Sequence, residues 1–195
     1  MFGLLFCIRA VVTDWVLLPA EDVSNYGEWV GRIVKACKAV SDIVSEVLNS
    51  DSPEGQAGSS CDGQTLLMCC WRSSKEVSHL LAALIDKLPY EELGDGAVLS
   101  VSEVKDIGNF FTRLLGTTVH RGAFEQAFIG FSNVCAFMWS SAEREFRAYL
   151  EDMLDETLTA IAQEEEEGAK SFCATRRSAG KRLLYVLQQL IAASA

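Results

Sequence analysis

Apolar side chains recur at every third or fourth position along nearly the whole chain, and this spacing restricts the possible folds more than any other feature. In the stretch 28–48, charged residues fill the positions between the apolar ones. An apolar stripe with a period of about 3.6 residues is typical of an amphipathic α helix that buries one face. The apolar residues of this stretch are Val30, Ile33, Val34, Cys37, Val40, Val44, Val47 and Leu48.

The same period predicts further helices along the chain, and two of them are preceded by a start signal. Ser100-x-x-Glu103 and Ser140-x-x-Glu143 both match the capping box. In that motif the serine and the glutamate side chains each accept a hydrogen bond from a backbone N–H that the helix leaves free. The further helices are expected at about 65–88, 103–115, 124–138, 143–161 and 183–191.

These helices predict an all-α fold, because the chain shows neither a β-hairpin turn nor an alternation of strand and helix. About six or seven helices joined by short turns fit a HEAT/armadillo-like α-solenoid segment of antiparallel helices. We expect residues 1–195 to form one such segment of a larger protein, with a flexible loop at about 50–63 and an acidic loop at about 164–170. A closed helical bundle is the competing fold, since no strict repeat period is visible.

The charge and motif content argue against an enzyme and against a self-contained nucleic-acid binder. The chain has 17 Lys+Arg against 27 Asp+Glu, a formal net charge of −10, whereas nucleic-acid binders normally carry a basic surface. The sequence holds no Gly-rich phosphate loop and no G-x-S-x-G nucleophile motif. We interpret the carboxylate runs Glu91-Glu92 and Glu164 to Glu167 as solvated surface. With two histidines in the chain, no metal site is expected.

The seven cysteines and the apolar start of the chain fit a cytoplasmic protein. No cysteine pair has the C-x-x-C spacing of a zinc or redox site, so we expect reduced cysteines that act as small core residues in a cytosolic or nuclear compartment. The apolar stretch 1–15 is interrupted by Arg9 and is shorter than the roughly 20 residues of a membrane span. We interpret it as a core helix.

The first of three polar clusters lies on the helix expected at 65–88. Trp71 and Lys75 are four residues apart, and so are Arg72 and Glu76, so each pair shares a helix face. The plain interpretation is an Arg72–Glu76 ion pair beside a core tryptophan. The functional interpretation is a recognition surface on which an aromatic side chain and an arginine meet a partner.

The second cluster, His120 to Glu125, stands at a helix start. No second histidine or set of cysteines is near enough in sequence to complete a metal site, so we interpret His120 as a hydrogen-bonded residue between helices. Gly122 would allow two helices to approach closely, and Arg121 can pair with Glu125 at a spacing of four residues.

The third cluster is basic and follows the glutamate run. Its five basic residues stand together without an acid, and adjacent arginines at a helix start oppose the helix dipole. This unfavourable placement suggests that the arginines interact with a negatively charged group. An intramolecular clamp onto the glutamate run and a site for phosphate or an acidic partner both fit. The basic residues are Lys170, Arg176, Arg177, Lys181 and Arg182.

The three clusters occur in the order found in one protein family. The stretches 67–77, 120–125 and 173–180, together with 18–21 and 52–55, resemble the conserved domain (DUF2428) of the thyroid adenoma-associated protein (THADA) family. The resemblance covers most of the chain from about residue 17 to 180. Three long matches in the same order are hard to obtain by chance, so we consider the resemblance specific.

The resemblance implies a segment of a large cytoplasmic α-solenoid that has no catalytic residues and no cofactor of its own. Members of this family support 2′-O-methylation of nucleotide 32 in the tRNA anticodon loop by a partner methyltransferase of the FtsJ type. The expected partners are that enzyme, which would hold S-adenosylmethionine, and tRNA, with no membrane and no small-molecule substrate. Candidate contact residues are Arg176, Arg177, Ser178, Gly180, Trp71, Arg72, Lys75, Glu76, His120, Arg121 and Glu125.

The acidic net charge keeps a second function open. A general protein-interaction α-solenoid without an RNA role, for example in signalling or calcium handling, would also carry a solvated acidic surface.

Overall fold

The computed structural model describes residues 1–14, 23–49, 63–88, 99–168 and 188, and these residues form an all-helical array. The all-α prediction is confirmed, and each expected helix between residues 28 and 161 is present. Most ends lie within three residues of the expected ones, but the first of these helices starts five residues earlier and the last ends seven residues later. The helices are α1 (Phe2–Thr13), α2 (Val23–Leu48), α3 (Gly63–Lys87), α4 (Val101–Thr117), α5 (Arg121–Ser140) and α6 (Arg144–Gly168).

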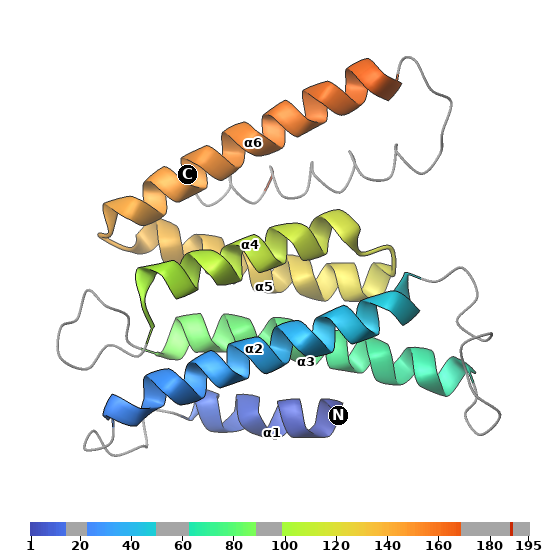
Figure 1. Cartoon of the computed structure of the whole chain (residues 1–195), viewed down its shortest axis with the longest axis vertical. Helices are drawn as coiled ribbons and strands as arrows, with labels where there is room; N and C mark the ends of the chain where they lie inside the picture. The colour runs from blue at the N-terminus through green and yellow to red at the C-terminus, as the bar shows by residue number, and fades with distance from the viewer. Residues whose placement is uncertain (15–22, 50–62, 89–98, 169–187, 189–195) are drawn as a thin grey trace.

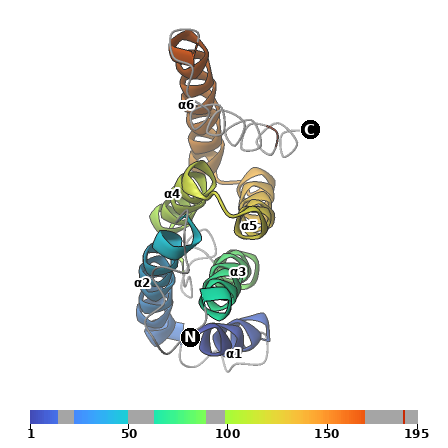
Figure 2. The same ribbon diagram turned by 90° about the vertical axis from the view of Figure 1, so that its right-hand side faces the viewer.

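The helices form two layers that lie side by side, and within each layer the helices are stacked along the long axis of the molecule (Figure 2). Helices α2, α4 and α6 lie in one layer, and α1, α3 and α5 lie in the other (Figures 1 and 2). Helix α3 is central, because it packs against α1, α2 and α5. The side chains buried between the layers are mainly aromatic and aliphatic. The largest include Phe111, Phe131, Phe146, Leu80, Leu84 and Ile107.

The capping box predicted at the start of α4 is confirmed. Ser100 Oγ accepts a hydrogen bond from the backbone N–H of Glu103 at 3.2 Å. Glu103 Oε2 in turn accepts one from the backbone N–H of Ser100 at 2.8 Å. Both bonds satisfy donors that a helix start leaves free, which explains why α4 begins at Val101.

The second predicted capping box, at Ser140 and Glu143, is wrong. Helix α5 continues to Ser140, whose hydroxyl donates to the carbonyl of Phe137 at 3.0 Å in the last helical turn. Ser141 accepts the backbone N–H of Glu143 instead, at 3.1 Å. The predicted motif fails because α5 continues over Ser140, so this serine cannot be the residue that precedes the next helix.

The acidic loop expected at about 164–170 is also wrong over 164–168, where α6 continues to Gly168. Glutamate is a good helix former, so a run of four such residues extends a helix that is already formed. Residues 50–62, which make up most of the other expected loop, lie outside the described residues, as do 169–187. The helix expected at 183–191 is described only at Gln188.

Helix α1 buries only one of its faces in the core. Leu5 and Val12 are buried, whereas Leu4, Phe6 and Val11 are exposed. The apolar start predicted as a core helix therefore packs through one stripe only. Among the described helices, none combines the length and the apolar character that crossing a membrane requires.

The cysteines that the structure describes divide into a buried and an exposed group, and Cys61 and Cys173 lie outside the described residues. Burial raises the pKa of the Cys37 and Cys135 thiols to about 12, and Cys70 is also buried. These three fit the predicted core role. Cys7 and Cys69 are exposed and do not fit it, because they point away from the packed stripes of α1 and α3.

Ion pairs join the helices of the even-numbered layer. Lys38 of α2 pairs with Asp106 of α4, and Lys105 of α4 pairs with Glu145 of α6, with Nζ and Oε2 2.6 Å apart.

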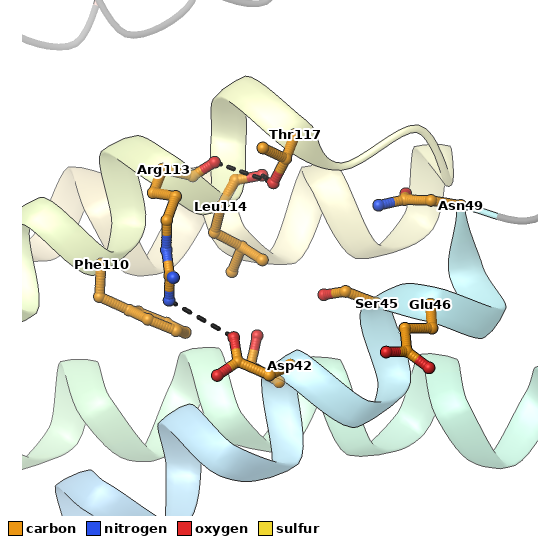
Figure 3. Close-up of a pocket in the computed structure, with 9 residues that line it drawn as sticks. Asp42, Ser45, Glu46, Asn49, Phe110, Arg113, Leu114 and Thr117 are labelled. Atoms are coloured by element: carbon orange, nitrogen blue, oxygen red, sulfur yellow. Dashed lines mark hydrogen bonds and ion pairs between the residues drawn. The ribbon is translucent and has the colours of Figure 1, made fainter.

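Arg113 of α4 reaches Asp42 of α2, with Nη2 and Oδ1 3.5 Å apart, across an open pocket of about 350 Å³ (Figure 3). Both side chains of this pair are largely exposed, at 60% and 65%, so the pair contributes little to stability.

Candidate recognition surface

Two of the three polar clusters meet where α3 packs on α5. A Cβ atom added at Gly122 would lie 2.7 Å from Trp71 Nε1 and 3.3 Å from His120 Cε1. Only a residue without a side chain allows the indole to lie this close to the backbone of α5. The expectation that Gly122 permits a close helix approach is confirmed, and Trp71 is the residue that makes the approach.

His120 acts within its own helix. Its Nδ1 accepts a hydrogen bond from the backbone N–H of Ala123 at 3.2 Å, which makes it the N-cap of α5. An accepting Nδ1 must be unprotonated, so the capping form of the ring is neutral. The predicted hydrogen-bonded role is confirmed, but the bond is local and does not join two helices. Within the described ranges, no group of three His, Cys, Asp or Glu side chains could hold a metal ion.

The Trp71 indole N–H is a buried donor that finds no hydrogen-bond acceptor among the described residues. Its ring packs beside the small apolar cluster of Val44, Leu48, Cys70 and Ala123. A buried donor without a partner costs about 1–3 kcal/mol. The packing of the ring at the junction of α3 and α5 therefore carries a local energetic cost.

The predicted Arg72–Glu76 ion pair is wrong. Glu76 is buried and pairs instead with Arg9 of α1, with Oε2 and Nε 2.9 Å apart. Arg72 lies over the ring of Phe2, 5.4 Å from its centroid. Helix α1 packs along α3 and offers each residue a partner from a distant part of the sequence, which spacing within α3 could not indicate.

An open cavity of about 390 Å³ lies at the edge of the contact between α1 and α3 and is lined by residues of both helices. We call it the α1–α3 cavity. Glu76 is neutralised by Arg9, and in the part of the chain that the structure describes neither Arg72 nor Lys75 forms an ion pair. The cavity is therefore locally basic, although the chain is acidic. Its lining residues are Phe2, Gly3, Phe6, Trp71, Arg72, Lys75 and Glu76.

The sequence predicted the α3 side of this cavity but missed the α1 side. Phe2 and Phe6 are four residues apart, and this spacing on an apolar helix reads as core. Their place on a partly exposed surface follows from how α1 docks on α3. Phe6 is 52% exposed, which sets it apart from the core rings.

Arg121 and Glu125 form the predicted pair across one turn of α5, with Nε and Oε1 2.8 Å apart. The Arg121 side chain is 92% exposed, so the pair is solvated and weak. Arg176, Arg177, Ser178 and Gly180 lie outside the described residues, and their role as contact residues stays a prediction.

Comparison with known proteins places these motifs in a family. The family model described as THADA/TRM732, DUF2428 matches residues 28–195. The tRNA (32-2′-O)-methyltransferase regulator THADA of Drosophila melanogaster is 32% identical over 98% of this chain, and that of Mus musculus is 34% identical over 90%. The tRNA (32-2′-O)-methyltransferase regulator trm732 of Schizosaccharomyces pombe is 28% identical over 82%.

The match covers only part of these relatives. The chain spans 13%, 9% and 11% of the length of the Drosophila, mouse and fission yeast proteins. No solved structure matches the chain. Since the family model covers most of the chain and the polar clusters stand inside the match, the chain belongs to the THADA/TRM732 family.

Proposed function

We propose that this chain is a non-catalytic part of a regulator that supports 2′-O-methylation of nucleotide 32 in the tRNA anticodon loop. The observation that carries the proposal is the similarity, over most of the chain, to proteins named as regulators of that methyltransferase. The enzyme would be a separate FtsJ-type subunit that holds S-adenosylmethionine. The proposed setting is the cytoplasm, with tRNA as the second partner and no small-molecule substrate.

The arrangement of helices supports a role in positioning. Successive helices alternate between two layers (Figure 2), an arrangement that suits a HEAT/armadillo-like α-solenoid in which each helix pair contacts its neighbours. We propose that residues 1–195 are one segment of a longer array. A rigid array that holds enzyme and tRNA together would raise the rate by orienting the target ribose at the partner's site.

The candidate contact residues form two groups, one at 71–125 and one at 176–180. Trp71, Arg72 and Lys75 gather beside the α1–α3 cavity, and His120 and Arg121 stand at the adjacent start of α5. For Arg176, Arg177, Ser178 and Gly180 the support is the resemblance of their motif to the family. Arginine suits contacts to phosphate or carboxylate, because its guanidinium donates two parallel hydrogen bonds.

A chimeric relative tests this proposal. In cells that lack the Drosophila melanogaster relative, a version of it whose matching segment is replaced by this chain should restore 2′-O-methylation of nucleotide 32. An Arg176→Ala, Arg177→Ala version should lose that activity, whereas the matched Arg144→Ala, Arg147→Ala version on α6 should keep it. A chimera that accumulates normally but leaves nucleotide 32 unmethylated would contradict the proposal. Unchanged methylation with the first double variant would exclude those two arginines.

The acidic net charge favours one alternative, a general protein-interaction α-solenoid without an RNA role, as in signalling or calcium handling. Under this alternative, the chain copurifies with neither an FtsJ-type methyltransferase nor tRNA. Recovery of both partners with the tagged chimera, which carries this chain, would exclude it.

A further inference from the structure

We propose that the α1–α3 cavity binds an unpaired nucleotide of RNA, with its phosphate at Arg72 and Lys75 and its base against the exposed ring of Phe6 on α1. The inference rests on the proposed function, because that function makes tRNA a partner. It adds a site on this chain and names the chemistry that the site recognises.

The charges around the cavity fit a phosphate. Arg9 neutralises the buried carboxylate of Glu76, so the cations that remain are Arg72, which is exposed, and Lys75, which is half-buried. Within the described part of the chain, neither has a carboxylate partner. A phosphate placed between them would be held by a guanidinium and an ammonium on adjacent turns of one helix.

The rings beside these cations fit a base. Phe2 and Phe6 lie one turn apart on α1 and line the same cavity. Arg72 lies over the Phe2 ring and Arg9 over the Phe6 ring, with Cζ 5.4 and 5.2 Å from the ring centroids. Phe6 is nevertheless 52% exposed, so it is the ring that offers a surface to a base. Sites for single-stranded nucleic acid combine cationic groups that follow the backbone with aromatic faces on which bases stack. An acidic protein segment would use the cations but would have no need of the rings, so RNA is the occupant that uses both.

The cavity also has room at its α1 side. Gly3 lines it, and a Cβ atom added there would meet nothing within 4 Å. A larger side chain at this position can therefore narrow the cavity without disturbing a packed neighbour. This offers a variant that tests the site while leaving every cation in place.

A binding measurement tests the role of the two cations. A fluorescein-labelled RNA hairpin with the sequence of a tRNA anticodon arm is titrated with the full chain, and fluorescence anisotropy reports the bound fraction. The Arg72→Ala, Lys75→Ala variant should bind about tenfold more weakly. Its affinity should also depend less on salt, with the log–log slope reduced by about 1 to 2. The control is Lys35→Ala, Arg147→Ala, which removes the same charges from exposed positions on α2 and α6. It should bind as the unmodified chain does.

The Gly3→Leu and Gly3→Ala variants test whether RNA occupies the α1–α3 cavity. They provide this test even if the Arg72→Ala, Lys75→Ala variant fails to fold. Leucine should weaken RNA binding several-fold, whereas alanine, which adds a single methyl group, should leave it near the original value. Equal binding by Gly3→Leu and Gly3→Ala would overturn the proposal, as would equal binding by the two charge variants. Displacement of the RNA by a poly-glutamate peptide at the same concentration would also overturn it, and would assign the cavity to an acidic protein.

These outcomes separate the site from the proposed function. If the variants bind RNA normally while the chimera restores methylation of nucleotide 32, only this site is rejected. If the variants lose RNA binding while the chimera fails to restore methylation, the site stands and the regulatory role is rejected.

Discussion

Trp71 and Gly122 show how two single residues join segments about 50 positions apart in the sequence. The glycine removes the side chain that would collide with the indole, and the indole loses its hydrogen-bond partner on packing. Both residues could be singled out from their motifs. Their contact could not, because nothing in either helix indicates which face of the other it meets.

Gly122→Ala should destabilise the protein by about 1–3 kcal/mol, because its Cβ atom would lie 2.7 Å from Trp71 Nε1. Gly116→Ala on α4 is the matched control, since an added Cβ there meets nothing within 4 Å. The control should stabilise by up to about 1 kcal/mol through helix propensity. Urea unfolding followed by circular dichroism measures both, and equal effects would show that the α3–α5 approach is not tight.

Trp71→Phe should change the free energy of unfolding by less than about 1 kcal/mol. It removes the unpartnered indole N–H, which offsets the loss of ring contacts. Trp71→Ala removes the ring as well and should cost about 3 kcal/mol. Thermal unfolding of the two variants distinguishes them, and a large loss with phenylalanine would mean that the N–H has a partner in solution.

Thiol alkylation should follow burial. Because burial raises the pKa of Cys37 and Cys135 to about 12, their thiols stay protonated when the pH rises to about 9, near the ordinary thiol pKa. Iodoacetamide at that pH should label Cys7 and Cys69 in the folded protein and reach Cys37 and Cys135 only after unfolding. The unfolded thiols ionise first, so their linkage to folding lowers stability as the pH rises above about 9. Peptide mass mapping gives the labelled positions, and labelling of Cys37 in the folded state would contradict its burial.

At the scale of helices, the sequence predicted most of what depends on neighbours along the chain. The 3.6-residue spacing of apolar side chains predicted the helices from 28 to 161, and Ser100 and Glu103 predicted the start of α4. Both signals act between residues within about one helical turn of each other. The failures at Ser140 and at the glutamate run concern where a helix stops. Stops depend on how far packing and helix propensity carry a helix already formed.

Partners between helices could not be predicted in the same way. Arg72 and Glu76 have the spacing of an ion pair, but α1 supplies Arg9 to the buried glutamate and Phe2 to the arginine. For this reason the sequence predicted the α3 residues of the α1–α3 cavity but not its α1 residues. Its cations stand in a recognisable motif, and its rings look like ordinary core residues until α1 is docked.

Arg9→Ala should loosen the docking of α1 on α3. It leaves the buried Glu76 carboxylate without its partner. Because the arginine side chain is 28% exposed, solvent screens part of this interaction, and we expect the free energy of unfolding to fall by about 1–2 kcal/mol. Arg121→Ala breaks a largely exposed pair and should change stability by less than about 0.5 kcal/mol. Hydrogen exchange of the α1 amides reports the docking directly, and unchanged protection in Arg9→Ala would contradict this role for the pair.

At the scale of the whole molecule, the net charge of −10 is unevenly distributed. Helix α6 carries nine acidic residues and two arginines, and it lies at the opposite end of the array from α1 (Figure 1). The locally basic α1–α3 cavity is therefore far from the main acidic surface. The net charge of −10 alone argues against an RNA binder. Because the acidic helix α6 is far from the α1–α3 cavity, a local contact with RNA at that cavity is physically reasonable.

The most direct test of the regulatory role is a reconstituted reaction. A purified FtsJ-type methyltransferase, its tRNA substrate and S-adenosylmethionine are combined with and without this chain, and 2′-O-methylation of nucleotide 32 is measured, with a full-length relative as the positive control. The component that carries the chain is the purified chimera, in which this chain replaces the matching segment of the Drosophila melanogaster relative. We expect methylation to rise when the chimera is added and to be absent when the enzyme is omitted. Methylation that rises with the full-length relative but stays unchanged at every ratio of folded chimera to enzyme would contradict the proposed role of this chain.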